Sequence, residues 1–440
     1  MLRFYIALAA AKSAYLAIKL LKHSGGTSFA GMVALKICPD FLKYCNKYVK
    51  SSKYTVTGTN GKTTTAGMLA RILEQDGEKV IHNVKGANML TGIANVFALS
   101  IPKKFDCAVL ESDEAYLTKL YDYISADFLI VTNLFRDQLD RYGELATTAG
   151  LIQSAIDKTN GLLLFLNADD PLVANMGKEK EAFYYGFEEV EYMLKNHKTS
   201  TAPSEVFACA CGEKLQYSKQ FFAQEGHYYC PKCDYKRPDP DCKGYAQIYD
   251  DYTILKVEFK GQSYYFILNT VGLYNAYNAL GAITCALVTG VEYEVIKTAV
   301  KNYKSIFGRT ERKIINGHNT LIQLIKNPTG ASEVLKTVDL KSNILIAIND
   351  NYADGRDVSW LWDADFEQLK DTSNPIVVSG IRAKDMAVRL KYAGVPTDKI
   401  KVIENLKQAV EFVTNSDKME RNVTILPTYT ALLSLNKMKF

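Results

Sequence analysis

Tyr54-Thr-Val-Thr-Gly-Thr-Asn-Gly-Lys-Thr-Thr-Thr65 joins a run of β-branched residues, through a glycine turn, to a helical pattern that continues to Leu73. A strand, a glycine loop and a helix N-terminus together bind anions, because backbone N–H groups and the positive end of the helix dipole converge there. The lysine would reach the β- and γ-phosphates of ATP, and the threonine after it would hold Mg²⁺. The stretch therefore predicts an ATP site made by Gly58, Thr59, Asn60, Gly61, Lys62, Thr63 and Thr64. The alternative is an ordinary turn between a strand and a helix, since only two residues separate the two glycines.

The overall composition narrows the class of protein. The chain has 440 residues, 48% hydrophobic and 23% charged, as in an ordinary globular protein, and its length fits two or three domains. The net charge of +5 is mild and does not favour a nucleic-acid partner. No short apolar segment is followed by a small-residue cleavage site, as in a secretory signal peptide. Because four of the nine cysteines cluster at the spacing of a metal site, we expect a reducing cytoplasm rather than a disulfide framework.

The first 23 residues have the pattern of a helix. Lys12 and Lys19 interrupt its apolar run, which makes it too short and too charged to span a bilayer. Two roles remain for this helix. It packs on the first domain, or its basic residues Arg3, Lys12, Lys19 and Lys22 contact anionic lipid headgroups. We expect the first role, with peripheral binding at the inner face of the membrane as the alternative.

Short apolar runs alternate with amphipathic segments after the glycine loop. Strands are expected at residues 79–82, 106–111, 128–132 and 161–166. Strands that alternate with helices predict a parallel sheet, and ligands bind at the carboxyl ends of such strands. Glu111 ends one strand, where its carboxylate would be a suitable ligand for Mg²⁺ together with Thr63. The alternative is that Glu111 and the acids after it are ion-paired surface groups.

Four cysteines form two close pairs in an inserted segment at about residues 205–240. They are Cys209, Cys211, Cys230 and Cys233. One residue separates the first pair, two separate the second, and 18 lie between the pairs. This spacing is typical of a zinc ribbon, and four thiolates leave no position for water, so the predicted Zn²⁺ is structural. Redox pairing and plain burial are the alternatives, and Cys242 and His227 are substitute ligands if the tight first pair does not close on the metal.

A second α/β pattern begins after about residue 315. Its strands are expected at residues 320–325, 343–348, 375–378 and 422–426. The loop at 349–363 is dense in acids and contains both tryptophans of the chain, Trp360 and Trp362. Aromatic residues and arginine are enriched at partner interfaces. The loop is therefore either an interface or a turn rich in Asn and Asp whose tryptophans fold into the core.

The motifs from residue 57 to residue 311 resemble, in order, those of the Mur ligase family, whose members form amide bonds by phosphorylating a carboxylate with ATP. The matching segments are the glycine loop, Thr132-Asn133 with Asp137, Gln138 and Asp140, Asn167-Ala-Asp169-Asp170-Pro171, Tyr185-Gly186, Asn275 with Asn278, and Gly308-Arg309-Thr-Glu311. The resemblance implies that Asn275 and Asn278 bind the adenine and that Arg309 contacts a phosphate. Gln138 stands where the family has a histidine that helps to hold a second Mg²⁺, for which glutamine is a weaker ligand.

Further features narrow the resemblance. Only about 55 residues precede the glycine loop, which leaves no room for the UDP-binding domain of other Mur ligases. With the cysteine pairs and the segments 326–330 and 349–360, the whole chain resembles the MurT family, the synthetase subunits of lipid II isoglutaminyl synthase. The fold implied is α/β. Its parts are an N-terminal helical segment (1–50), a Mur-ligase-like central P-loop ATPase domain (51–312) with the inserted four-cysteine zinc ribbon, and a C-terminal Rossmann-like α/β domain (313–440).

The resemblance also implies a reaction and a partner. Such subunits use ATP to phosphorylate the α-carboxyl of D-Glu in the stem peptide of lipid II, and ammonia attacks the acyl phosphate to give D-isoglutamine. Lys62 and Glu111 would serve this catalysis. The ammonia comes from a glutaminase subunit, GatD, and no cysteine here lies in a strand–turn–helix elbow with a suitable histidine. The C-terminal domain would lend an aspartate to the catalytic histidine of GatD, and the motif match gives Asp357, with Asp354 and Asp350 as alternatives.

Two other functions share part of this pattern. A ligase that adds an amino acid or glutamate to a peptide or folate needs the same ATP site but no glutaminase partner. A zinc-containing scaffold would bind nucleotide without chemistry. ATP turnover in the presence of glutamine or ammonia would separate the three functions.

Overall fold

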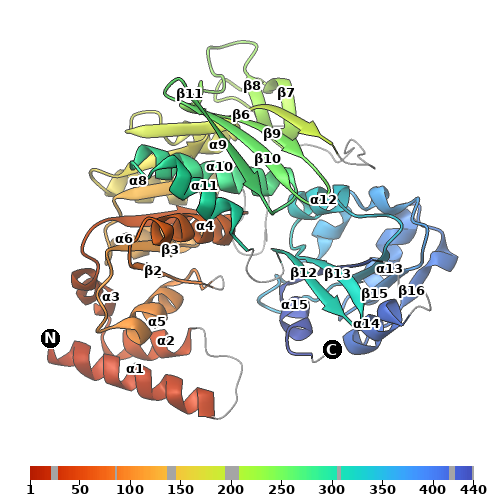
Figure 1. The fold of residues 1–440 in the computed structure, drawn as a ribbon, viewed down its shortest axis with the longest axis horizontal. Coiled ribbons are helices and arrows are strands. Elements are labelled where there is room, and N and C mark those ends of the chain that lie inside the picture. The colour runs from red at the N-terminus through yellow and green to blue at the C-terminus, as the bar shows by residue number, and fades with distance from the viewer. Residues whose placement is uncertain are drawn as a thin grey trace.

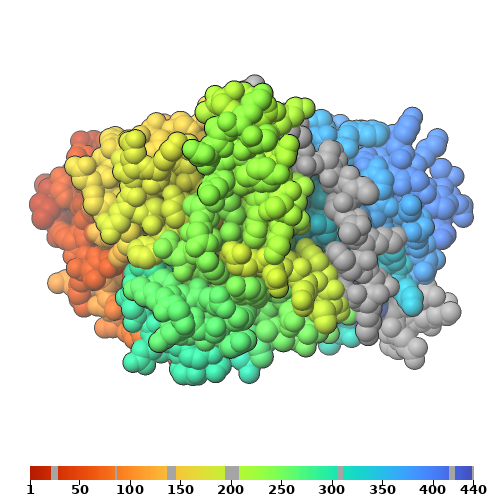
Figure 2. Space-filling view, turned by 90° about the horizontal axis from the view of Figure 1, so that it is seen from above, coloured from red at the N-terminus to blue at the C-terminus, as the bar shows by residue number. Residues whose placement is uncertain are grey.

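Two β-sheets divide the molecule into two bodies (Figure 1). The computed structural model describes residues 1–20, 28–84, 87–135, 145–193, 208–304, 309–415 and 422–438. Residues up to 304 form the larger body, and residues from 309 onward form the smaller one. Seen from above, the first residues of the chain lie at one end of the molecule and the smaller body lies at the other (Figure 2).

Helices precede the first strand. They are α1 (Leu2–Leu20), α2 (Phe29–Ile37), α3 (Phe41–Cys45) and the 3-10 turn η1 (Asn46–Tyr48). The helix expected over the first 23 residues is confirmed as far as those residues are described, and Phe4, Ala7 and Ala11 bury one of its faces. Within the described residues, none of the helices combines the length and the apolar character that crossing a membrane requires.

Nine strands form the sheet of the larger body, in the order β11-β10-β9-β6-β5-β4-β1-β3-β2. Their bounds are β1 (Lys53–Thr57), β2 (Val80–His82), β3 (Cys107–Glu111), β4 (Phe128–Val131), β5 (Leu163–Asn167), β6 (Ala182–Tyr192), β9 (Cys242–Ile248), β10 (Thr253–Phe259) and β11 (Gln262–Leu268). Strands β1 to β6 and β9 are parallel, so the predicted parallel sheet and its four predicted strands are confirmed. The antiparallel pairs formed by β9, β10 and β11 were not predicted.

Helices cover both faces of this sheet. They are α4 (Lys62–Gln75), α5 (Leu90–Ser100), α6 (Glu114–Tyr121), α8 (Leu145–Lys158), α9 (Pro171–Asn175), α10 (Leu273–Val288) and α11 (Tyr293–Lys301). Side chains alternate along a strand, so Cys107 and Val109 of β3 reach the core under α4 and α10, whereas Ala108 and Leu110 reach the core under α5 and the N-terminal helices. Since β1 lies between β3 and β4, the glycine loop opens at the carboxyl edge of the parallel strands.

A separate hairpin stands between β6 and β9 in the sequence. Its strands are β7 (Gln216–Phe222) and β8 (Glu225–Tyr229), which pair antiparallel. Gln224 in the turn of the hairpin and Glu225 at the start of β8 are buried in the larger body rather than exposed to solvent. The predicted ribbon segment is therefore anchored at two places, through its cysteines and through this turn.

The smaller body contains a six-stranded sheet in the order β12-β13-β17-β14-β15-β16. Its elements are β12 (Arg309–Ile315), β13 (His318–Gln323), α12 (Pro328–Lys336), β14 (Asn343–Ala347), η2 (Ser359–Trp362), η3 (Phe366–Leu369), β15 (Ile376–Ser379), α13 (Ala383–Tyr392), η4 (Thr397–Lys399), β16 (Ile400–Val402), α14 (Leu406–Thr414), β17 (Val423–Pro427) and α15 (Tyr429–Leu435). Apart from the antiparallel β12–β13 pair, the strands are parallel. The four predicted strands correspond to β13, β14, β15 and β17, and the edge strands β12 and β16 were missed.

Candidate active site

The loop between β1 and α4 requires glycine at two positions. Gly58 and Gly61 have φ angles of 120° and 84°, which L-residues with a side chain rarely adopt. A Cβ at Gly61 would lie 1.9 Å from Oδ1 of Asn278, and one at Gly58 would lie 2.3 Å from Oγ1 of Thr132. The glycine loop is thus enclosed by α10 on one side and by the end of β4 on the other.

The residues that follow β4 fix the shape of the glycine loop. The backbone N–H of Asn60 donates to Oδ1 of Asn133 at 2.8 Å, and Oγ1 of Thr132 donates to the carbonyl oxygen of Asn60 at 2.7 Å. Sequence reasoning found this pair only as part of a family motif, and its contacts hold the loop in place. The remaining members of that motif, Asp137, Gln138 and Asp140, lie outside the described residues.

Lys62 holds its ammonium group inside the glycine loop. Its Nζ lies 3.3 Å from the carbonyl oxygen of Thr59 and 3.1 Å from Oε1 of Glu114. Burial alone would lower the pKa of Lys62, but the carboxylates of Glu114, Asp113 and Glu111 outweigh burial and raise this pKa. Lys62 is therefore a permanent cation at the point where a bound anion would meet the first turn of α4. The pairing with Glu114 was not predicted, although Glu114 is one of the acids that follow Glu111 in the sequence.

Thr63 and Glu111 meet at the end of the parallel strands. Oγ1 of Thr63 donates to one carboxylate oxygen of Glu111 at 2.7 Å, and Nδ2 of Asn88 lies 3.4 Å from the other oxygen. Both Thr63 and Glu111 are buried. A hydroxyl and a carboxylate oxygen side by side form a hard donor set of the kind that Mg²⁺ prefers, with water completing its coordination. The two predicted magnesium ligands are thus brought together in a geometry that fits the ion.

The two asparagines predicted to bind the adenine, Asn275 and Asn278, have different surroundings. Asn278 lines the cleft beside the glycine loop, and its Oδ1 accepts from Oγ1 of Thr65 at 3.4 Å. Asn275, almost one turn earlier on α10, is buried, and its Nδ2 donates to the carbonyl oxygen of Val271 at 2.8 Å. The structure therefore brings Asn278 to the glycine loop, whereas Asn275 stabilises the start of α10. Arg309 begins β12, the first strand of the smaller body.

A cleft between the two bodies runs past the glycine loop. The larger body lines it with Lys62, Glu111 and Asn278, and the smaller body lines it with Lys326, Asn327 and Asp354. Nδ2 of Asn327 donates to Oδ1 of Asn60 at 2.9 Å, and Nζ of Lys326 lies 3.4 Å from the carbonyl oxygen of Thr59. The smaller body thus brings a second cation to the glycine loop, which sequence reasoning missed. The only signal was local, a lysine just before the Asn-Pro start of α12.

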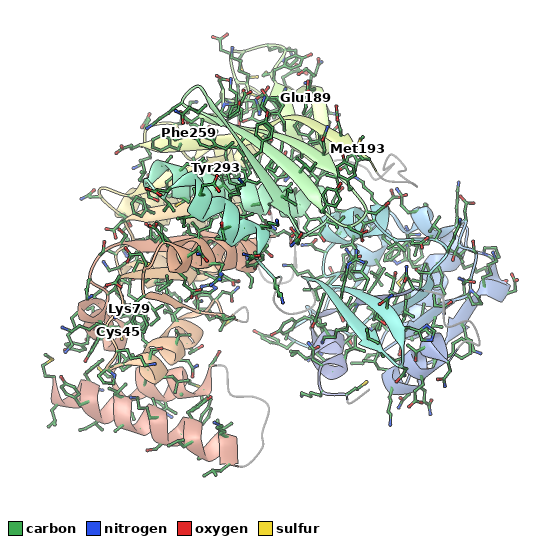
Figure 3. All side chains as sticks on the ribbon, in the orientation of Figure 1. Cys45, Lys79, Glu189, Met193, Phe259 and Tyr293 are labelled. Atoms are coloured by element: carbon green, nitrogen blue, oxygen red, sulfur yellow. The ribbon has the colours of Figure 1, made fainter. Side chains whose placement is uncertain are left out.

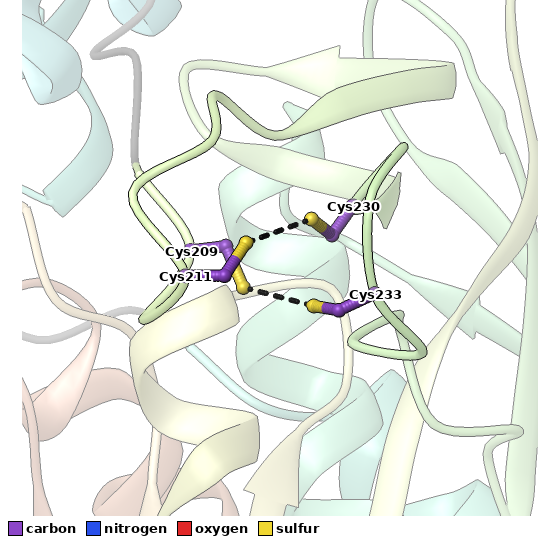
Figure 4. Close-up of side chains that lie close together, drawn as sticks. All are labelled: Cys209, Cys211, Cys230 and Cys233. Atoms are coloured by element: carbon purple, nitrogen blue, oxygen red, sulfur yellow. Dashed lines mark hydrogen bonds between the residues drawn. The ribbon is translucent and has the colours of Figure 1, made fainter.

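The four predicted metal ligands converge at the base of the hairpin (Figure 4). The Sγ atoms of Cys209, Cys211, Cys230 and Cys233 all lie within 4.8 Å of one another. The closest pairs are Cys209–Cys233 at 3.3 Å and Cys211–Cys230 at 3.5 Å. Tetrahedral Zn²⁺ with Zn–S bonds of about 2.3 Å requires sulfur atoms about 3.8 Å apart. The cluster therefore fits a zinc ion closely, and Cys242 and His227 are not among its members.

The acidic loop after β14 places two of its aspartates in structural roles. Asp350 forms an ion pair with Arg382 at 2.7 Å. Asp354 is buried and accepts from the backbone N–H of Thr430 at 2.7 Å, in the first turn of α15. Burial raises the pKa of Asp354 above its ordinary value. These two carboxylates hold the loop against the smaller body.

Asp357 lies in a different setting. It is exposed, and its Oδ1 accepts from the backbone N–H of Ser359 at 2.8 Å, which orients the carboxylate at the surface. The loop was predicted to be either an interface or a turn whose tryptophans fold into the core, and each tryptophan fits a different one of these alternatives. Trp360 packs against the core of the smaller body, whereas Trp362 is 54% exposed and its ring lies 5.6 Å from that of Tyr392.

Comparison with known proteins identifies the family. The model of the Mur ligase middle domain matches residues 56–228, and the model of the MurT ligase C-terminal domain matches residues 324–432. A solved structure, pseudomurein peptide ligase type C from Methanothermus fervidus, aligns with a TM-score of 0.68 at 21% identity, over 88% of this chain and 79% of that one. This similarity confirms the Mur-ligase-like fold.

Two curated relatives are similar over most of their length. The MurT subunit of lipid II isoglutaminyl synthase (glutamine-hydrolyzing) from Streptococcus pneumoniae is 36% identical over 422 residues, 94% of this chain and 92% of the relative. The subunit of the same name from Staphylococcus aureus (strain COL) is 34% identical over 378 residues, 84% of each chain. With this identity and coverage, the chain belongs to the MurT family of Mur-ligase-like enzymes.

Proposed function

We propose that this chain amidates the α-carboxyl of D-Glu in the stem peptide of lipid II, with ATP as energy source and ammonia supplied by a GatD-type glutaminase subunit. The names of its relatives support the class of reaction and the existence of a second subunit. The observation that carries the proposal is the cleft, which Lys62 and Glu111, the partner of Thr63, line from one body and Lys326 lines from the other. The cofactors of the proposed enzyme are ATP, Mg²⁺ and a structural Zn²⁺.

The cleft supports a phosphorylation step. Bound nucleotide supplies the phosphoryl group that turns the substrate carboxylate into an acyl phosphate, which ammonia converts into the amide with release of phosphate. Lys62 and Lys326 approach the glycine loop from the two bodies, so positive charge is already in place where negative charge develops. Thr63 and Glu111 would hold the magnesium ion.

The cysteines support an external source of ammonia. All nine lie in described residues, and the five outside the metal cluster are buried. Burial raises the pKa of Cys107 to about 12 and that of Cys242 to about 12, the reverse of what a glutaminase nucleophile needs. The chain therefore depends on a partner for glutamine hydrolysis.

The surface that follows Asp357 supports a docking site for that partner. Exposed apolar side chains gather on α13 and on the turn after Asp357. They are Trp362, Val388 and Tyr392. Aromatic residues of this kind anchor interfaces. A glutaminase seated here would bring its catalytic histidine to the oriented carboxylate of Asp357. Because the proposed substrate is a lipid, the complex would act at the inner face of the membrane.

The Asp357→Asn substitution tests this proposal. A carboxylate fixes the tautomer of a catalytic histidine and stabilises its cation, and loss of that role costs on the order of 10⁴-fold in serine proteases. Cysteine is the better intrinsic nucleophile, so we expect a smaller but still large loss, about 10²-fold or more, in glutamine-dependent amidation by the complex. Amidation with added ammonium salt should be nearly unchanged, because the cleft does not contain Asp357.

The matched control is Asp363→Asn, which removes the same charge from an exposed position in the same loop. This variant should amidate at the unsubstituted rate with glutamine and with ammonium. Equal losses with glutamine and with ammonium in the Asp357→Asn variant would show that Asp357 serves the synthetase or the fold. Absence of amidation by the unsubstituted complex with either nitrogen source would overturn the proposed function itself, and addition of an amino acid to a stem peptide or folate would then be the activity to measure.

A further inference from the structure

The first helix of the chain is apolar on two opposite faces. One face is buried through Phe4, Ala7 and Ala11. The opposite face is exposed and almost entirely apolar. Its members, spaced three and four residues apart, are Leu2, Tyr5, Ile6, Ala9, Ser13, Leu16, Ala17 and Leu20. We call this set the outer stripe of α1. A helix at the surface of a globular protein normally has one apolar face, which packs on the core, so a second, exposed apolar face is a surface that needs a partner.

The outer stripe lies at the edge of the molecule. In Figure 1, α1 forms the lower margin of the larger body, with α2 and α5 on its inner side. Figure 3 shows side chains along α1 that extend away from the rest of the protein. Leu2, Leu16 and Leu20 are 76%, 57% and 83% exposed. On the neighbouring helix α2, Phe29 and Met32 are also exposed.

The segment that contains α1 is basic. Residues 1–50 contain eight lysine or arginine residues and a single acid, Asp40, for a net charge of +7. The whole chain has a net charge of +5, so the remaining 390 residues are slightly acidic. Lys19 is exposed beside the outer stripe. An apolar stripe flanked by basic residues matches the interface of an anionic bilayer, where acyl chains take up the apolar side chains and headgroups attract the cations.

We propose that the outer stripe of α1 docks the protein on an anionic membrane, with the helix lying in the plane of the headgroups. This inference rests on the proposed function, in which the substrate is a membrane lipid. A second copy of the chain is a poorer occupant, because two segments that each carry +7 would repel one another. With 19 residues, α1 lays about 28 Å of helix along the surface.

Helix α1 is connected to the cleft through α2 and α5. Gly31 of α2 packs so tightly on α5 that a Cβ there would lie 1.9 Å from the carbonyl oxygen of Thr91. At the N-terminal end of α5, Asn88 and Met89 line the cleft, and the body of α5 packs against α1 and α2. The 11 residues of α5 span about 16 Å. A docked membrane would therefore lie at a fixed distance from the phosphorylation site, within reach of a carboxylate on a peptide that is attached to a lipid.

Vesicle co-sedimentation of the full chain tests the proposal. The unsubstituted protein should bind vesicles of phosphatidylcholine and phosphatidylglycerol, should bind pure phosphatidylcholine less, and should be released by added salt. The double substitution Ile6→Gln/Leu16→Gln should weaken binding at least about tenfold, because it places two amides in the apolar stripe. Both positions are more than half exposed, so the fold should be retained. The matched control is Ile314→Gln, at a 75% exposed position of β12 in the smaller body, which should bind like the unsubstituted chain.

Several outcomes would overturn the proposal. They are absence of binding to anionic vesicles, equal binding by the Ile6→Gln/Leu16→Gln variant, and a dimer that this variant converts to a monomer, which would make the outer stripe a self-interface. Activity separates this inference from the proposed function. With its glutaminase partner, the variant should amidate a water-soluble stem peptide at the unsubstituted rate and amidate lipid-anchored substrate in vesicles more slowly. If neither protein amidates any substrate, the proposed function fails, and vesicle binding still decides the role of α1.

Discussion

At the scale of single residues, the proposed chemistry depends on a short set of contacts around the glycine loop. Oγ1 of Thr63 donates to Glu111 at 2.7 Å, and both groups are buried at the carboxyl edge of the sheet. Lys62 remains charged because three nearby carboxylates outweigh the effect of its burial. These contacts place the proposed magnesium donors and a fixed cation at the same point, which is what transfer of a phosphoryl group requires.

Replacement of Thr63 tests this arrangement directly. Thr63→Ala should lower ATP-dependent amidation by about 10²-fold or more at saturating Mg²⁺, because it removes one of the two oxygen donors proposed for the ion. The fold should survive, since one hydrogen bond contributes only about 1 kcal/mol. Thr63→Ser keeps the hydroxyl and should retain most of the activity. Normal turnover by Thr63→Ala, measured beside its melting temperature, would remove Thr63 and Glu111 from the proposed magnesium site.

Residues of the candidate site were predictable from sequence where a motif is local or where a side chain marks the end of a strand, as for Glu111, which contacts Thr63 across 48 residues. The spacing of Gly58, Gly61 and Lys62 within one turn defines an anion loop, so the sequence was sufficient for these positions. The partner of Lys62 was not predicted, because Glu114 lies beyond the strand end, in the first turn of α6, and only the fold brings its carboxylate to 3.1 Å from Nζ. Asn327 is 267 residues from Asn60, which puts their contact out of reach of any local pattern.

At the scale of elements, the zinc ribbon is bound into the body that carries the glycine loop. Nε2 of Gln224 in the hairpin turn donates to the carbonyl oxygen of Leu134 at 2.5 Å, and Nδ2 of Asn167 donates to Oε1 of Glu225 at 2.9 Å. Leu134 directly follows Asn133, which fixes the glycine loop. The inserted segment therefore helps to hold the residues that fix the glycine loop, a contact that its spacing in the sequence did not predict.

Metal analysis tests the ribbon. The purified protein should contain one zinc ion per chain, and Cys233→Ser should lose it and lower the melting temperature by about 5 °C or more, because binding of a structural metal contributes directly to folding. Cys285→Ser provides the control, since Cys285 is buried in α10 and lies outside the cluster. This variant should keep its zinc. A protein free of zinc under reducing conditions would show that the four thiols have another role.

The predicted and missed elements differ in their environment. Strands such as β3 and β14 are buried on both faces, and their continuous apolar runs are easy to recognise. The edge strands β12 and β16 lack such runs, and β16 has only three residues. The strands β10 and β11 are added to the edge of the parallel sheet as antiparallel neighbours. The alternation of strands and helices earlier in the chain predicts only parallel strands, so this arrangement was missed.

At the scale of the whole molecule, the cleft is built by two bodies that meet at the glycine loop. The amide groups of Asn60 and Asn327 exchange hydrogen bonds, with Nδ2 of Asn327 at 2.9 Å from Oδ1 of Asn60 and Nδ2 of Asn60 at 3.4 Å from Oδ1 of Asn327. Oδ1 of Asn327 also accepts from the backbone N–H of Gly330 and so caps α12. The side chain of Asn327 thus caps a helix of the smaller body and holds that body against the glycine loop.

The isosteric change Asn327→Asp separates these two roles. Aspartate caps a helix as well as asparagine does, so α12 and the melting temperature should be nearly unchanged. The new carboxylate cannot donate to Oδ1 of Asn60, and it adds negative charge beside the loop that is proposed to bind phosphates. We expect the KM for ATP to rise about tenfold, which corresponds to a loss of about 1.4 kcal/mol in binding. Asn405→Asp is the matched control, because Asn405 caps α14 in the same body through the backbone N–H of Gln408 and is exposed outside the cleft. Equal KM values for the two variants would mean that the Asn60–Asn327 pair only holds the bodies together and does not shape the nucleotide site.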